Sequence, residues 1–150
     1  PPPPGPDPFE QAAERRLGGD AVHAPGLDLG NAARAFVPAG AADGLVTVDG
    51  ATEKLLALMC ATSCDVSAAQ RITLGGATAR AAAAKRIRLR TQRLRLRAGQ
   101  PGVVVLRLTQ AQRRQVRRAR RATLQIAIAV KDASGATARD TVRFRLKARR

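Results

Sequence analysis

The chain has 150 residues and a formal net charge of +16, and its 45% apolar content can supply one hydrophobic core if most of the chain folds. It contains no Trp or Tyr and three Phe, which argues against a platform of aromatic rings for binding single-stranded nucleic acid or sugars. No apolar run approaches the roughly 18 residues that span a bilayer, and we expect any signal peptide or anchor to lie outside these residues.

The first 44 residues are dominated by Pro, Gly and Ala. Residues 1–8 read PPPPGPDP, which favours an extended, semi-rigid spacer. The following FEQAAERRL predicts two turns of helix that end at Gly18, and the apolar residues after it show neither helical nor strand spacing. We therefore expect residues 1–44 to form a largely irregular linker, from which Phe36 and Val37 pack back on the domain.

Alternating apolar residues begin at Leu45 and predict a sheet domain over residues 45–150. The first two strands are expected in LVTVD and EKLLALMC, with DG as a turn between them, and a short third strand in QRITL before GG. The alanine-rich ATARAAAAK, residues 77–85, fits a strand and a helix equally well.

The second half of the chain has the stronger strand pattern. Leucine and isoleucine alternate with arginine in RIRLRTQRLRLR, residues 86–97, which predicts strands with one buried and one solvated face. A further strand is expected in VVVLRLT, and a terminal β-hairpin in TLQIAIAVKD and TVRFRLK, which flank the turn DASG. The expected inward positions of these three strands are Val104, Leu106, Leu108, Leu124, Ile126, Ile128, Val130, Val142, Phe144 and Leu146.

The alternation fails between Thr109 and Arg121, where TQAQRRQVRRARR places its apolar residues close to one helical face. This stretch predicts a short basic helix that crosses between two strands at an edge of the domain. About seven strands with one such crossover fit two packed sheets better than a closed barrel. The expected fold is an all-β, immunoglobulin-like two-sheet sandwich of about seven strands with one short basic helical crossover.

The order of short motifs over residues 45–150 resembles the immunoglobulin-like or fibronectin-like modules of secreted surface proteins from GC-rich actinobacteria. These motifs are CATSC, ITLGG, RAGQPG, VVVLRLT, LQIAIAVKDASG and TVRFRLK. The last hairpin of such modules commonly carries D-A-x-G, and Asp132, Ala133, Ser134 and Gly135 hold these places here. The resemblance implies a non-catalytic spacer, stalk or adhesive module, extracellular or attached to the cell envelope, whose partners are neighbouring modules or surface proteins.

Cys60 and Cys64 are the two cysteines of the chain. Their short spacing in a secreted-looking module predicts a disulfide, and two unconnected buried thiols are the alternative. A fully extended chain would hold their Cα atoms about 13 Å apart, so a bridge requires a tight turn at residues 61–63. Closing so small a loop would contribute about 2 kcal/mol. A zinc site would need four ligands, whereas the chain offers two thiols and one distant imidazole.

No catalytic residue, metal site or cofactor is expected. His23 is the only histidine and reads as a solvated loop residue, because the pattern around it positions no nucleophile or carboxylate. The serines lie in turn contexts without a nucleophile elbow, and the glycine pairs are too short to cradle a phosphate. We expect no enzyme activity and no small-molecule substrate.

The arginines are the remaining candidates for a binding site. One cluster lies in the predicted crossover and consists of Arg113, Arg114, Arg117, Arg118, Arg120 and Arg121. A second set would line one outward face if its segments are strands: Arg86, Arg88, Arg90, Arg93, Arg95 and Arg97. Such arrays can hold phosphates or uronates through paired, charge-assisted hydrogen bonds. The alternative is a solvated face whose arginines reflect a GC-rich genome and discourage association of sheet edges.

Two functions follow from these observations. The first is a structural or adhesive module that spaces or displays other domains. The alternative is a polyanion-binding module whose partner is an acidic cell-wall polymer or nucleic acid, held by the arginines of the crossover. An uncovered sheet edge would in addition let copies of the chain associate.

Overall fold

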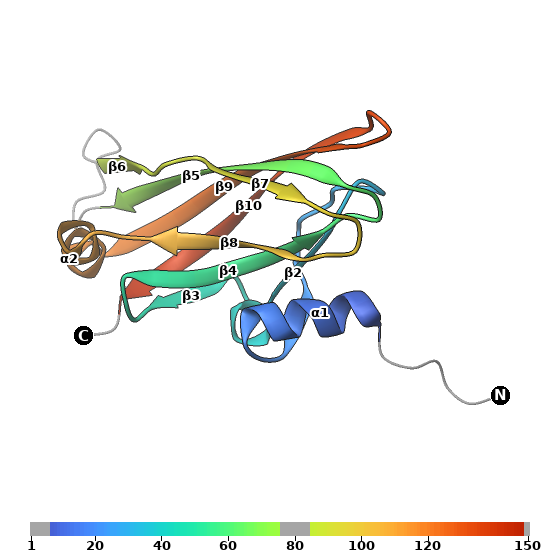
Figure 1. The fold of residues 1–150 in the computed structure, drawn as a ribbon. Helices are drawn as coiled ribbons and strands as arrows, with labels where there is room; N and C mark the ends of the chain where they lie inside the picture. The colour runs from blue at the N-terminus through green and yellow to red at the C-terminus, as the bar shows by residue number, and fades with distance from the viewer. Residues whose placement is uncertain (1–6, 76–84, 149–150) are drawn as a thin grey trace.

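The computed structural model describes residues 7–75 and 85–148 (Figure 1). Its helical elements are α1 (Pro8–Leu17), the short 3-10 helix η1 (Ala39–Ala41) and α2 (Gln110–Arg118). Its strands are β1 (Ala21–His23), β2 (Arg34–Pro38), β3 (Leu45–Val48), β4 (Thr52–Met59), β5 (Cys64–Gly75), β6 (Lys85–Arg88), β7 (Gln92–Leu96), β8 (Gly102–Arg107), β9 (Arg121–Asp132) and β10 (Thr137–Ala148).

The strands form two sheets that pack against each other (Figure 1). Sheet A has the strand order β1-β2-β4-β8, and sheet B has the order β3-β10-β9-β5-β6, with β7 also paired to β5. The described pairs are antiparallel except for β3 and β10, which run parallel with Leu45 beside Arg145. The prediction of an all-β two-sheet sandwich is confirmed.

The main core lies between the inward faces of the two sheets. Alternate residues of a strand point to the same face, so Val104 and Leu106 of β8 and the leucine, isoleucine and valine positions of β9 and β10 reach this core. Leu124 and Ile126 of β9 are fully buried, as are Leu56 and Leu58 of β4 in the facing sheet. Every position predicted to point inward between residues 104 and 146 is buried.

Helix α1 covers the outer face of sheet A, so this sheet is buried on both sides (Figure 1). Ala13 of the helix belongs to a second apolar cluster with Phe36 of β2 and with Ala57 and Met59 of β4. The helix ends at Gly18, which has the left-handed φ of +82° that glycine adopts without strain. The helix predicted over residues 9–17 and its stop at Gly18 are confirmed.

The prediction that residues 1–44 form a largely irregular linker is wrong for residues 7–44. This stretch supplies α1, β1, β2 and η1, and β2 lies inside sheet A between β1 and β4. Phe36 and Val37 are fully buried, as expected, but they point to different clusters, because Val37 faces sheet B and Phe36 faces α1. Strand β2 buries consecutive residues on both faces, and β1 has only three residues, so neither shows an alternation that the sequence pattern could indicate.

The described residues contain ten strands rather than about seven. The N-terminal segment adds β1 and β2, and the arginine-rich stretch 86–97 contributes two separate strands, β6 and β7. Strand β5 runs from Cys64 to Gly75 and is longer than the predicted third strand, because the inward alternation of Ile72 extends back through Ala68 to Val66. Most of the ambiguous stretch 77–85 lies outside the described residues, and Lys85 begins β6.

The predicted basic crossover is confirmed as α2, which connects β8 of sheet A to β9 of sheet B at one end of the sandwich (Figure 1). Thr109 begins the helix with a capping box, in which its hydroxyl accepts from the Gln112 backbone and the Gln112 side chain accepts from the Thr109 backbone. Val116 is the buried anchor of the helix and is 3% exposed.

The predicted terminal hairpin is also confirmed, with β9 and β10 paired from Lys131 and Thr137 inward. Asp132 organises its turn, because one carboxylate oxygen accepts hydrogen bonds from Ser134 and from the backbone of Ala136. These bonds, with that of the Ser134 hydroxyl first, lower the pKa of Asp132. Gly135 completes the turn at a φ of +90°.

Candidate binding surface

The outer face of sheet B is basic. Cross-strand pairing places its outward side chains in rows that run from β6 and β7 across β5 and β9 to β10. One row consists of Arg93, Ser67, Ala129 and Arg139. A second row, four residues further along β5, consists of Arg88, Arg71, Gln125 and Arg143. Arginines of β6 and β7 on one side and of β10 on the other, which we call the border strands of this surface, therefore flank the central strands β5 and β9.

Small side chains form the floor between these arginines. The floor consists of Ser67, Ala69, Ala127 and Ala129, which are neighbours on the two central strands β5 and β9. Two adjoining hollows of about 710 Å³ and 300 Å³ lie over this floor. The basic residues around the hollows are Arg71, Arg88, Arg93, Arg95, Lys131 and Arg139. We call these four floor residues and six rim residues the basic basin.

The positive charge of the basic basin is weakly compensated. Among the residues that line its hollows, Asp65 is the acidic one, and it lies 3.3 Å from Arg95 in an ion pair whose partners are 66% and 90% exposed. So exposed a pair contributes little and is screened by salt. The ion pair between Asp7 and Arg34 lies at the start of α1, on the far side of sheet A from these hollows. The rim therefore presents guanidinium groups to solvent.

A break between β6 and β7 brings the predicted arginines onto one face. Arg88 pairs with Arg71 and Gln92 pairs with Ala68, so this border strand has one more residue than β5 between the two pairs. The extra residue shifts the alternation by one position, as a β-bulge does, and Arg88 and Arg93 point to the same side. Without it, residues five apart in a strand would face opposite ways.

The structure places the two predicted arginine sets as follows. Of the second set, Arg86, Arg88, Arg93 and Arg95 lie on the outer face of sheet B, as predicted. Arg90 lies in the break between β6 and β7, and Arg97 lies just beyond β7, so these two do not belong to the rows. The prediction that all six line one face is therefore correct for the residues within the strands only.

The crossover arginines lie on or next to α2, at the end of the sandwich. Arg114, Arg117 and Arg118 are exposed, whereas Arg113 is half-buried and its Nε has no hydrogen-bond partner among the described residues. Arg120 follows the helix and is exposed. Arg121 begins β9 opposite Gly75, so it belongs to the outer face of sheet B rather than to the helix.

Sequence reasoning missed the floor of the basic basin and the rim residues Arg71, Lys131 and Arg139. A signal for the floor exists in TLQIAIAVKD, where alanines occupy the outward positions 127 and 129 beside inward isoleucines. Polar residues would be usual at outward positions of a half-buried strand. The rim residues lie on β5, β9 and β10, and their approach to β6 and β7 depends on the strand order, which the pattern alone does not determine.

Beneath the break between β6 and β7, two glutamine side chains cover the edge of sheet A. Gln92 donates to the Val103 carbonyl at 3.1 Å and accepts from the Val105 amide at 3.0 Å, and Gln70 donates to the Val105 carbonyl at 2.9 Å. These amides take the place of a neighbouring strand along β8. The Gln70 Oε1 atom is buried without a partner among the described residues, beside a hollow of about 180 Å³.

The predicted disulfide is present. Cys60 and Cys64 are bonded with their Cα atoms 6.3 Å apart, and both are buried. The bridge joins the end of β4 in sheet A to the start of β5 in sheet B, across the tight turn expected at residues 61–63. The turn is held by hydrogen bonds on both sides, because the Cys60 carbonyl accepts from the Gly99 amide and the Ser63 carbonyl from the Ala133 amide.

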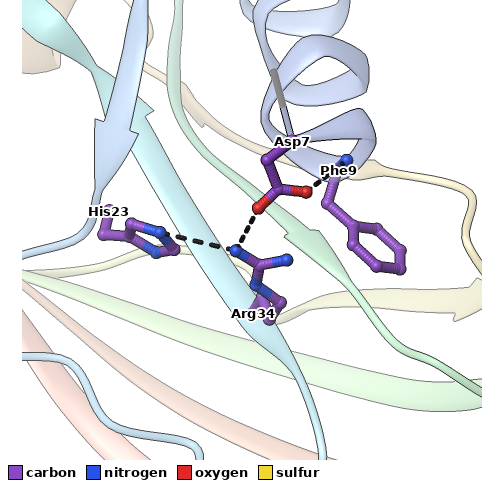
Figure 2. A network of polar contacts seen from close by, with 4 residues as sticks. All are labelled: Asp7, Phe9, His23 and Arg34. Carbon is purple, nitrogen blue, oxygen red and sulfur yellow. Dashed lines mark hydrogen bonds and ion pairs between the residues drawn. The ribbon is translucent and has the colours of Figure 1, made fainter. Parts of the chain in front are cut away.

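Figure 2 shows the polar contacts that fasten α1 to sheet A. Asp7 caps the helix by accepting from the Phe9 amide, and its second carboxylate oxygen accepts from the guanidinium of Arg34 on β2. The same guanidinium lies over the rings of Phe9 and Phe36, with centroids 5.2 Å and 5.4 Å from its central carbon. His23 is exposed as predicted, but it lies in β1 and stacks on Phe36 rather than in a loop.

These contacts predict an acid-sensitive step in the docking of α1. Arg34, followed by the Phe9 amide, lowers the pKa of Asp7 below its ordinary value despite partial desolvation. An aspartate with a lowered folded-state pKa adds stability above its unfolded pKa of about 4, and this stability is lost as the pH falls through the folded value. Asp7→Asn should be less stable than the wild type at pH 7, and the difference should shrink towards pH 2.

The measurement is urea unfolding from pH 7 to pH 2 for both proteins. Asp43→Asn is the matched control, because Asp43 makes a local hydrogen bond to the Leu45 amide and has no basic side-chain partner among the described residues. Parallel stability curves for the wild type and Asp7→Asn across this range would contradict the role of Asp7.

In the described parts of the chain, no group of three or more His, Cys, Asp or Glu residues lies close enough together to hold a metal ion. Nor does any described helix have the length and hydropathy to cross a membrane. No protein-family model and no curated protein sequence matches the chain.

Proposed function

We propose that the chain is a non-catalytic, immunoglobulin-like structural or adhesive module of a secreted or envelope-attached protein. The strand order supports the immunoglobulin-like part. Neighbours β4 and β8 lie in one sheet and neighbours β5, β9 and β10 in the other, and the chain changes sheets at the disulfide turn and at α2. Strands B and E of immunoglobulin-like sandwiches share one sheet, and strands C, F and G share the other, in the same manner.

The placement of the chain ends carries the spacer role. Figure 1 shows α1 beginning near one end of the sandwich and β10 finishing at the other. A chain that enters at one end and leaves at the opposite end holds whatever precedes and follows it apart by the length of the fold. The parallel pairing of β3 with β10 also suits such a role, because a pull along the chain loads the bonds between these strands together rather than one after another.

A pulling experiment on single molecules tests this role. The chain is held through its two ends, and we expect a discrete unfolding event instead of the smooth extension of a flexible linker. Gly44→Pro should lower the unfolding force, because Gly44 precedes β3 at a φ of +81° that proline cannot adopt and its carbonyl accepts from the Arg145 amide of β10.

The matched control is Gly26→Pro, which makes the same change at a glycine with a φ of +73° in the loop between β1 and β2. If the pairing of β3 with β10 resists the pulling force, the unfolding force should fall more for Gly44→Pro than for Gly26→Pro. Equal losses for the two variants, or smooth extension of the wild type, would contradict the spacer proposal.

A second candidate function is polyanion binding, favoured by the exposed basic face of sheet B and the exposed arginines of α2. Guanidinium groups bind carboxylates and phosphates through paired hydrogen bonds, and the concentrated positive field raises the rate of encounter. The test is binding to acidic polymers over a series of salt concentrations. Steep salt dependence with binding that persists at physiological salt would support this function, and absence of binding would refute it.

Association of copies through sheet edges, the remaining partner prediction, finds little support in the strands at those edges. Edge strands β1 and β3 have three and four residues, β6 and β7 are separated by the bulge, and glutamine amides cover β8. Such short or covered edges offer little backbone to a second copy. Sedimentation of the purified chain at increasing concentration would show whether dimers form.

A further inference from the structure

We propose that the basic basin on the outer face of sheet B binds a single extended chain of an acidic polysaccharide. The inference rests on the second candidate function and gives it a site and a class of ligand. It also moves the site from the crossover helix α2, where the sequence alone placed it, to the sheet.

The first argument is the difference between the two outer faces. Sheet A is covered by α1, with Phe36, Ala57 and Met59 buried beneath the helix. No described element covers the corresponding face of sheet B, and the outward residues of its strands β5, β9 and β10 are polar or as small as alanine and glycine. Because these strands expose no large apolar side chain, they need no protein layer over them, and their hollows are accessible to a solute.

The second argument is the floor. If the arginines served only to keep the face solvated, long polar side chains would suit the central strands as well as the border strands. Instead Ala69 and Ala127 are neighbours on β5 and β9, and so are Ser67 and Ala129. The small side chains leave the two hollows open between guanidinium groups, so a ligand can reach the sheet surface and be contacted from both sides.

The third argument is the size of the basin. From Asp65 to Arg71 the floor strand advances six residues, roughly 20 Å at the ordinary rise of a strand. From β7 to β10 the sheet spans three strand spacings, roughly 14 Å, and the arginine side chains of the border strands stand within that width. An elongated space of this shape accommodates one extended polymer chain along the strands.

The chemistry of the lining selects the class of polymer. Arg93 and Arg139 stand on opposite sides of the Ser67 and Ala129 pair, so acidic groups on both edges of a chain would each meet a guanidinium fork. Single-stranded nucleic acid is disfavoured, because the basin has no aromatic side chain on which bases stack. A duplex would contact the rim without entering, so its binding would not depend on the floor. The ligand that uses both rim and floor is a non-aromatic chain with carboxylate or sulfate groups.

The test uses the full chain and three probes: polygalacturonate for carboxylates, size-defined heparin fragments for sulfates, and a DNA duplex. Affinity is measured by titration at several salt concentrations. Arg93→Gln with Arg139→Gln removes two exposed rim charges, and Arg117→Gln with Arg118→Gln removes two exposed charges from α2 as the matched control. Ala129→Ile fills the floor, leaves every charge in place and is compatible with a strand. Thermal unfolding of each variant shows whether it folds.

The rim pair should lower affinity for polygalacturonate or heparin by roughly ten-fold or more and flatten its salt dependence, while the α2 pair has a much smaller effect. Ala129→Ile should weaken polysaccharide binding and leave duplex binding unchanged. The probe that the rim pair affects most distinguishes carboxylate from sulfate ligands.

Four outcomes would overturn the inference. Equal losses of affinity for the rim pair and the α2 pair would agree with polyanion binding but would exclude the basin as its specific site. Unchanged polysaccharide binding in Ala129→Ile, or tighter binding of the duplex than of either polysaccharide, would exclude the proposed ligand. If the wild type binds none of the probes, the second candidate function fails together with the inference. Arg93 and Arg139 are exposed, so their replacement should not prevent folding, and the arginine variants test the inference even if Ala129→Ile does not fold.

Discussion

Replacing Phe36 by alanine should lower the free energy of unfolding by about 3–5 kcal/mol, the usual cost of truncating a fully buried phenylalanine. Phe36 lies on β2 beneath α1, where its ring joins Ala13, Ala57 and Met59 in the second apolar cluster. The ring also contacts Arg34, which fastens the start of the helix. Truncation should therefore loosen α1 in addition to leaving a cavity. Urea unfolding gives the loss of stability.

Limited digestion with trypsin reports on the helix itself, because Arg15 and Arg16 lie in its last turn. Cleavage there should be faster in Phe36→Ala than in the wild type, since docking protects the helix. Phe36→Leu is the control, because it retains most of the apolar volume and should cost less. A loss below about 1 kcal/mol for Phe36→Ala, far under the range for buried rings, would show that α1 is not docked on sheet A in solution.

The largest covalent contribution should come from the Cys60–Cys64 bridge. Cys60→Ala with Cys64→Ala should lower the free energy of unfolding by about 2 kcal/mol. Without the bridge the unfolded chain no longer contains a closed loop, so its conformational entropy rises. For a chain of this length the melting temperature should fall by roughly 4–8 °C. Treatment of the wild type with a reductant should produce a similar shift. Thermal unfolding with and without reductant measures both.

The double alanine variant itself is the control for the reductant, since a protein without thiols should not respond to it. If the wild type melts at the same temperature with and without reductant, the bridge does not stabilise the fold by restricting the conformations of the unfolded chain. A double variant that fails to fold would show a larger role than loop closure, because the bridge also fixes the point at which the chain passes from sheet A to sheet B.

The alternation of apolar and polar residues determined most of sheet B. Strands β9 and β10 and the turn between them could be predicted because each strand has one face in the core and one face in water. Apolar and polar residues therefore alternate along both strands with a period of two. The crossover helix is readable for a similar reason, because the alternation stops and a capping box begins at Thr109. The disulfide follows from two cysteines at a spacing that a tight turn can close.

Sheet A was harder to predict, because it is buried on both faces. Its strand β4 carries the continuous apolar run from Leu55 to Cys60, which has the composition of a doubly buried strand but does not say what covers the second face. The cover is α1, whose residues looked like part of a linker. The small alanines of α1 and of β1 contribute to a core only when another element is placed against them.

The sequence by itself determined the sandwich class, the terminal hairpin, the basic crossover and an excess of arginine with few acidic partners. Only the tertiary structure decided that α1 and β2 belong to the fold, and that arginines far apart in the chain surround a floor of alanines. The reason is physical, since local pattern reports which face of a strand is buried, whereas the neighbours of that strand depend on long-range pairing. Arg93 and Arg139 lie on opposite sides of Ser67 and Ala129 because of strand order and register, and the extra residue between β6 and β7 sets the direction of Arg93.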